Sequence, residues 1–179
     1  MGSEMCIRDS LYEARLTRAI KGTPQPRHVA IMADGNRRWA REAGFTDISH
    51  GHRQGAKKIS EMISWCKDTD IEVVTIYLLS TENLKRTTQE VQLLFDIISD
   101  VVTHLSKGDL DCQIRLVGHL DLLPAKVTER MRLAAQATEG NKGVIVNIAV
   151  GYGGRQEIVD AVQNLIRDEA GKGHSAEQI

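Results

Sequence analysis

The sequence contains few cysteines, and their arrangement suggests no cross-link or metal site. Cys6, Cys66 and Cys112 are the only three in 179 residues, and no CxxC pair occurs. An odd number of widely spaced cysteines argues against both a disulfide framework and a zinc site. The pattern is typical of reduced thiols, so we expect a cytoplasmic protein.

Long apolar runs and an excess of charge are also missing. No run approaches the roughly 20 residues that a membrane-spanning helix needs. The net charge of -1 provides no overall basic field for nucleic acid, so we expect no nucleic-acid partner. Residues 1–10, "MGSEMCIRDS", lack the apolar centre of a secretory leader. We interpret 1–10 as a non-native leader and expect residues 11–179 to belong to a single domain.

The sequence does contain strand and helix patterns in strict alternation. Apolar runs at 28–33, 71–79, 112–118 and 143–154 predict four strands. Helical spacing predicts helices at about 10–21, 36–43, 50–70, 88–105 and 124–138, and a last one after Gly154. Thr87 and Glu90 fit a capping box at the start of the fourth of these helices. We therefore expect an α/β fold, a mostly parallel sheet flanked by helices on both faces.

Three polar, glycine-bearing turns follow predicted strands. They are "DGNRRW" at 34–39, "STENLKR" at 80–86 and "GYGGR" at 151–155. Ligands of open α/β sheets bind beyond the carboxyl ends of the strands. We expect the three turns to converge there.

The first turn places Asp34 close to Arg37 and Arg38. Arginines at a helix N-terminus favour a diphosphate, whereas the acid would repel it unless a divalent cation lay between them. Mg²⁺ binds one or two carboxylates together with substrate phosphate oxygens, so a metal diphosphate explains the combination. The alternative is an ordinary strand-to-helix turn in which Asn36 caps the helix. His52 could likewise be a surface residue, and "GYGGR" is no dinucleotide fingerprint.

Four stretches together resemble the cis-prenyltransferases, or isoprenyl transferases, which include undecaprenyl diphosphate synthase. They are "HVAIMADGNRRWAREAG", "GHRQGAKKI", "YLLSTENLKRTTQEV" and "VNIAVGYGGRQEIVDAV", in the order that the family has them. The likeness runs from about Pro26 to the end and is strongest to the short-chain actinobacterial type that makes Z,E-farnesyl diphosphate. It implies Mg²⁺-dependent condensation of isopentenyl diphosphate with an allylic diphosphate, geranyl or farnesyl. It also implies a homodimer and an apolar product able to partition into a membrane.

The resemblance also assigns roles to individual residues. Asp34 matches the metal-binding catalytic acid, and Asn83 matches a catalytic residue that assists proton removal. We expect Asn83 to orient a relay, or the departing phosphate to take the proton, because an amide is a poor base. The residues that match substrate contacts are Gly35, Asn36, Arg37, Arg38, Trp39, His52, Ser80, Thr81, Glu82, Leu84 and Arg86.

The sequence departs from the family pattern at several positions. Arg37 stands where glycine is frequent, Leu84 replaces a frequent tryptophan, and Ile48 replaces a substrate-binding arginine. The family's late Arg-Thr-x-Gly block, which binds isopentenyl diphosphate, and a later metal-binding glutamate are not found. We therefore interpret the chain as an N-terminal fragment and expect little or no turnover from it. Leu78 could limit product length near the tunnel entrance, or it could simply pack the sheet.

Other functional classes remain open at this point. One is a phosphate- or nucleotide-binding module that carries the same turns but transfers no prenyl group. Another is a non-catalytic partner subunit, although such relatives generally lose the acid that Asp34 supplies. A domain without any site would leave three charged turns at one sheet edge unexplained.

Overall fold

The computed structural model describes residues 2–47, 49–108 and 110–175, and no side chains are described for 2–10. Ile48, which the resemblance aligned with a substrate-binding arginine, lies outside the described residues. The elements are, in chain order, α1 (Gly2–Ile20), β1 (His28–Met32), α2 (Asn36–Glu42), α3 (Ser49–Asp68), β2 (Val73–Ser80), η1 (Asn83–Lys85), α4 (Thr88–Lys107), β3 (Gln113–Val117), η2 (Leu120–Leu122), α5 (Ala125–Gln136), β4 (Ile145–Tyr152) and α6 (Gly154–Gly171).

The predicted alternation of strands and helices is confirmed, with small differences at the ends of elements. Helix α1 begins at Gly2 instead of near residue 10, while the origin of residues 1–10 stays a prediction. Pro124 is the N-cap of α5, one position before its first turn. Cys66 and Cys112 are buried free thiols, as expected. In the described part of the chain, no helix is long and apolar enough to cross a membrane.

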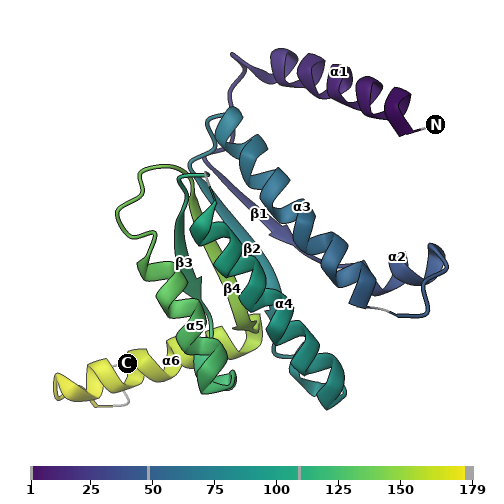
Figure 1. Cartoon of the computed structure of the whole chain (residues 1–179). Helices are drawn as coiled ribbons and strands as arrows, with labels where there is room; N and C mark the ends of the chain where they lie inside the picture. The colour runs from purple at the N-terminus through teal and green to yellow at the C-terminus, as the bar shows by residue number, and fades with distance from the viewer. Residues whose placement is uncertain (1, 48, 109, 176–179) are drawn as a thin grey trace.

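The four strands form one parallel sheet in the order β1-β2-β4-β3. Their carboxyl ends therefore meet at one edge, and the strand arrows in Figure 1 point away from the end of the molecule where α1 lies. This arrangement confirms the predicted fold class. Parallel strands need long crossover connections, which α3, α4 and α5 supply.

Helices α3, α4 and α5 lie side by side against one face of the sheet (Figure 1). The core between them contains Ile63, Val102 and Met131 from the helices and Ile76 and Ile148 from the strands, none of which is measurably exposed. Burying each such side chain contributes roughly 1.5–3 kcal/mol. This packing fixes the strand ends relative to the first turns of α3 and α4.

The opposite face of the sheet is more exposed. Met32, Tyr77, Ala149 and Val117 form one row across the strands, and the side chains at its two ends, Met32 and Val117, are 71% and 38% exposed. The predicted last helix, α6, carries an apolar stripe that is also exposed, at 47–67% for Ile158, Val159, Val162, Leu165 and Ile166. Among the described residues, then, the three crossover helices cover only one of the two faces, whereas the sequence predicted helices on both.

Candidate active site

The three polar turns converge, as predicted, around one cavity of about 1020 Å³ at the carboxyl edge of the sheet. The turns after β1, β2 and β4 all contribute to it, and α3 and α4 complete its wall. The predicted site residues that line it are Asp34, Gly35, Asn36, Arg37, Arg38, His52, Ser80, Glu82, Asn83 and Arg86.

The turn after β1 depends on a glycine. Gly35 has φ 87°, a left-handed conformation that side chains other than glycine rarely adopt. Its N–H donates to Oδ1 of Asp34 at 2.6 Å, which fixes the carboxylate over the turn. Asn36 is not the helix cap, because Gly35 occupies that position and Asn36 Nδ2 donates to the carbonyl of Ala33 at 3.2 Å. The charged groups that α2 brings to the cavity are Arg37, Arg38 and Arg41.

Two glycines of α3 let α2 approach closely. A Cβ atom at Gly51 would lie 2.1 Å from the backbone oxygen of Asn36, and one at Gly55 would lie 2.6 Å from its side-chain oxygen. The two glycines are four residues apart and therefore share one face of α3. Because neither glycine of "GHRQG" has a side chain, the turn that carries Asp34 can pack directly against α3.

The turn after β2 is closed by reciprocal hydrogen bonds. Ser80 N donates to Oδ1 of Asn83 at 3.2 Å, and Asn83 N donates to Oγ of Ser80 at 3.2 Å. A backbone N–H can only donate, so this contact fixes the orientation of the amide. Asn83 thereby uses its oxygen within the turn and retains its NH₂ group as a donor. Such a group can bind a phosphate oxygen, but it cannot accept a proton.

Charged side chains gather at the polar end of the cavity. Oε1 of Glu90 lies 2.8 Å from Nη1 of Arg86 and 3.6 Å from Nε of Arg37. His52 is 9% exposed, and its Nε2 has no hydrogen-bond partner among the described residues. Burial and then the charge of Arg86 lower the pKa of His52 from its usual 6.5, so the ring is neutral at pH 7.

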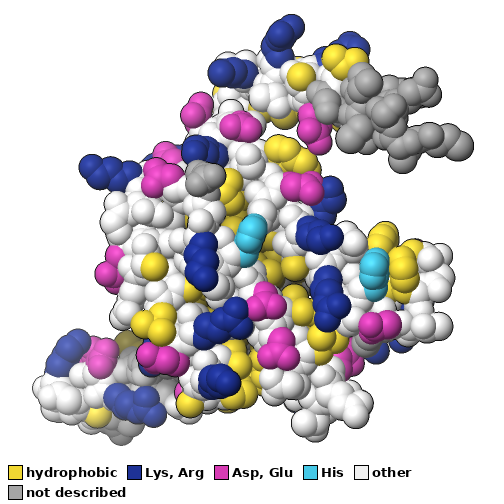
Figure 2. Space-filling model, in the orientation of Figure 1, with side chains coloured by type: hydrophobic (Ala, Val, Ile, Leu, Met, Phe, Trp, Pro, Cys, Tyr) yellow, Lys and Arg dark blue, Asp and Glu magenta, His cyan; other side chains and the backbone are white. Residues whose placement is uncertain are grey.

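Three predicted site residues do not line the cavity. Trp39 stacks on Phe45 and His50, with ring centroids 5.9 and 6.3 Å away. Figure 2 shows hydrophobic side chains beside a histidine on the part of the molecule that carries α2. Leu84 packs against the core, and Thr81 lies behind Gly153, where a Cβ atom would meet its Oγ1 at 2.6 Å. Leu84 and Thr81 therefore pack beneath the turns, whereas Trp39 is 45% exposed at the surface.

The cavity also has lining residues that the sequence did not identify as site residues. Tyr77, Tyr152, Arg41 and Arg155 add polar groups near the turns. An apolar lobe extends between α3 and α4, where Figure 2 shows hydrophobic side chains in the groove. Its residues are Ala56, Ile59, Leu78, Leu94, Ile97, Ile98 and Val101. The periodicity of α4 revealed an apolar stripe, but periodicity does not distinguish a cavity wall from solid core. Leu78 both lines the cavity and packs against the core.

A hard cation could be held here only together with its ligand. No group of three or more His, Cys, Asp or Glu side chains with metal-binding geometry occurs in the described part of the chain. Asp34 and Glu82 are the predicted carboxylates that line the cavity. One or two carboxylates with phosphate oxygens are what Mg²⁺ uses in phosphate sites, so these residues fit a metal diphosphate.

Fold and site together define an α/β protein with a cavity at the carboxyl edge of its sheet. One end of the cavity is cationic and suited to a phosphate group, and the other end is apolar. Comparison with known proteins gives the family. Residues 31–179 match the family described as "Putative undecaprenyl diphosphate synthase". The chain belongs to this cis-prenyltransferase family, a family of prenyltransferases that is typically Mg²⁺-dependent.

Several relatives are similar over nearly the whole chain. Isoprenyl transferase 1 of Corynebacterium diphtheriae is 62% identical over 94% of this chain and 63% of its own length. The (2Z,6E)-farnesyl diphosphate synthase of Thermobifida fusca is 49% identical over 91% of this chain and 63% of its own length. This chain therefore spans slightly less than two thirds of the length of these relatives.

Solved structures agree with this assignment. Lavandulyl diphosphate synthase from Lavandula x intermedia, in complex with dimethylallyl diphosphate, has a TM-score of 0.78 and 32% identity, over 86% of this chain and 66% of that one. A structure described as a probable undecaprenyl diphosphate synthase from Campylobacter jejuni has a TM-score of 0.66 at 24% identity, over 82% of this chain and 64% of that one, and supports the fold alone.

Proposed function

We propose that this chain carries the allylic diphosphate site of a Mg²⁺-dependent cis-prenyltransferase. The observation that carries the proposal is a single cavity with two chemically different ends. Asp34, Arg37, Arg38 and Arg86 lie at one end, and the apolar lobe between α3 and α4 forms the other. An allylic diphosphate has the same two parts, an anionic head and a hydrocarbon chain.

The residues of the cavity have distinct tasks in this reaction. Arg37, Arg38 and Arg86 would stabilise the negative charge that develops on the departing diphosphate. The NH₂ group of Asn83 would donate to a phosphate oxygen, leaving proton removal to the departing phosphate. The apolar lobe would exclude water from the reacting carbon. Asp34, with Glu82 nearby, would hold Mg²⁺, which polarises phosphate oxygens when bound.

The names of the relatives suggest the size of the substrates. The Thermobifida fusca relative is called (2Z,6E)-farnesyl diphosphate synthase. We therefore propose geranyl or farnesyl diphosphate as the allylic partner, isopentenyl diphosphate as the second substrate, and a short product. The limit that Leu78 sets on product length stays a hypothesis. A homodimer is likewise part of the proposal.

The direct test is binding of the allylic substrate to the 179-residue chain. We expect farnesyl diphosphate with Mg²⁺ to bind more tightly than inorganic diphosphate, measured by isothermal titration calorimetry. Asp34→Asn should remove the Mg²⁺ dependence, whereas Asp96→Asn, an exposed acid on α4, should not. Tight nucleotide binding without affinity for prenyl diphosphates would instead support the phosphate-binding module.

A further inference from the structure

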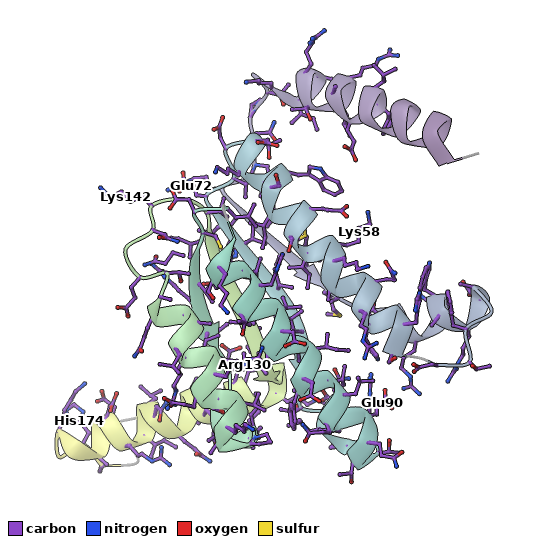
Figure 3. All side chains as sticks on the ribbon, in the orientation of Figure 1. Lys58, Glu72, Glu90, Arg130, Lys142 and His174 are labelled. Atoms are coloured by element: carbon purple, nitrogen blue, oxygen red, sulfur yellow. The ribbon has the colours of Figure 1, made fainter. Side chains whose placement is uncertain are left out.

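Glu90 connects two arginines that come from different turns. Its Oε1 atom lies 2.8 Å from Nη1 of Arg86, after β2, and 3.6 Å from Nε of Arg37, after β1. Its side chain is 10% exposed, compared with 25% for Arg86 and 40% for Arg37. Both arginines line the cavity, whereas Glu90 is not among the described residues that line it. Glu90 therefore lies behind the cationic rim, near the start of α4 (Figure 3).

The local sequence would allow Glu90 a different role. In a capping box, the glutamate side chain turns back to the backbone N–H of the capping residue. Only half of that box forms here, because Glu90 N donates to Oγ1 of Thr87 at 3.4 Å while the carboxylate binds Arg86. The carboxylate is thus directed away from the helix end and toward the two arginines.

Two nitrogens at this rim are buried without a hydrogen-bond partner among the described residues. They are Nε of Arg37 and Nε2 of His52. A buried unpartnered N–H costs free energy, so a ligand that accepts a hydrogen bond from Nε of Arg37 would regain it, and Nε2 of His52 would add a second donor in the tautomer that carries its proton there. Two guanidinium groups share one carboxylate, which leaves an excess of positive charge. The rim therefore fits an anion with several acceptor oxygens.

We propose that Glu90 is a positioning residue, which holds Arg37 and Arg86 together so that the two turns present one preformed diphosphate-binding rim beside His52. The proposal rests on the proposed function for the diphosphate head, but it does not depend on the prenyl chain. Long arginine side chains lose rotamer freedom when they bind a ligand. Glu90 restricts them before the ligand arrives, which raises affinity through preorganisation.

Charge and position predict opposite effects for a substitution at Glu90. A carboxylate behind an anion site repels the anion, so Glu90→Gln should strengthen diphosphate binding if only charge matters. If Glu90 positions the arginines, the same substitution should weaken binding despite the more positive site. The sign of the change therefore separates the two explanations.

The experiment measures the affinity of the 179-residue chain for inorganic diphosphate with Mg²⁺ by calorimetry. We expect Glu90→Gln to weaken binding about tenfold and to weaken it much less in an Arg37→Gln background, because coupled residues are non-additive. Asp96→Asn makes the same charge change on the exposed face of α4 and should leave affinity unchanged. The Nε–H resonance of Arg86 should shift in Glu90→Gln and not in Asp96→Asn.

The outcomes separate this proposal from the proposed function. Equal or tighter diphosphate binding by Glu90→Gln would overturn the positioning role and leave prenyl transfer standing. If Glu90→Gln weakens binding of inorganic diphosphate but wild type shows no preference for farnesyl diphosphate, the positioning role holds and prenyl transfer is contradicted. A wild-type chain that binds no diphosphate would overturn both. If Glu90→Gln does not fold, the Arg37→Gln variant tests the proposal by itself. An unchanged affinity of that variant for inorganic diphosphate would contradict the proposal.

Discussion

Gly51 controls how closely the turn that carries Asp34 can lie against α3. A Cβ atom at this position would lie 2.1 Å from the backbone oxygen of Asn36 and 3.1 Å from Cβ of Ala40, which is fully buried. A backbone oxygen cannot rotate away as a flexible side chain can. Any side chain here must therefore push α2 away from α3.

We predict that Gly51→Ala destabilises the protein and disturbs the diphosphate site. Overpacking of this kind costs about 1–3 kcal/mol of unfolding free energy, measurable by urea denaturation. Diphosphate affinity should fall as well, because Arg37 and Arg38 move with α2. Gly171→Ala is a matched control: Gly171 ends α6 with nothing near its Cβ position, so that variant should be as stable as wild type or slightly more so. Wild-type stability and affinity in Gly51→Ala would show that α2 has room to move.

Single residues differ in how far their roles could be predicted from the sequence. Asp34 and Arg37 were predicted as site residues because an acid beside arginines after a strand indicates metal-diphosphate chemistry. Glu90 was interpreted only as half of a capping box, since nothing local shows that Arg37, 53 positions earlier, would reach it. Trp39 was predicted to contact substrate; it stacks on Phe45 and does not line the cavity, so its contact with substrate stays a prediction. Motif membership does not indicate which way a side chain points.

At the scale of elements, strand β3 lacks a neighbouring strand on one side within the described residues, and the loop after α5 supplies hydrogen-bond partners there. Strand β3 lies at one edge of the sheet order, so half of its N–H groups have no neighbouring strand. Thr138, which is 1% exposed, accepts a hydrogen bond from Ile114 N at 2.9 Å and donates one to Ala135 O at 2.8 Å. Asn141 Nδ2 donates to the carbonyl of Cys112 at 2.9 Å. The loop after α5 thus completes the edge of β3.

We predict that Thr138→Val weakens this edge even though the side chain keeps its shape. The Ile114 amide would remain buried without a partner, which costs about 1–3 kcal/mol. Urea denaturation measures the global loss, and hydrogen exchange should show faster exchange at Ile114. Thr138→Ser keeps the hydroxyl and should retain slow exchange at that amide. Slow exchange in Thr138→Val would mean that another group, such as water, replaces the hydroxyl.

Element types and order were predictable because strand and helix patterns are local and strong. The parallel sheet followed from the alternation, and the convergence of the three turns followed from parallel strands ending at one edge. The sequence could not indicate which sheet face the crossover helices cover. Nor could it show that the apolar stripe of α6 would be exposed within the described part of the chain. Both depend on contacts between segments distant in sequence.

At the scale of the whole molecule, His52 links protonation to stability and to ligand binding. The ring is 9% exposed and lies near Arg37, Arg86 and Glu90. Burial and the two arginines lower its pKa in the folded protein, while Glu90 opposes them. In the unfolded chain the pKa returns to about 6.5. The unfolded state therefore binds this proton more tightly than the folded state.

The sign of the pH effect follows from linkage. The stabilising contribution of neutral His52 is fully present above about pH 6.5 and is lost as the pH falls toward the folded-state pKa. We predict that the unfolding free energy of wild type, measured by urea denaturation, decreases more steeply between pH 7 and 5 than that of His52→Asn. His104→Asn, which removes an exposed histidine of α4, should keep the wild-type slope. Saturating diphosphate should reduce the slope, because an anion beside the ring favours its protonated form and raises the pKa. Parallel pH profiles for wild type and His52→Asn would mean that the ring is already solvated in the folded protein.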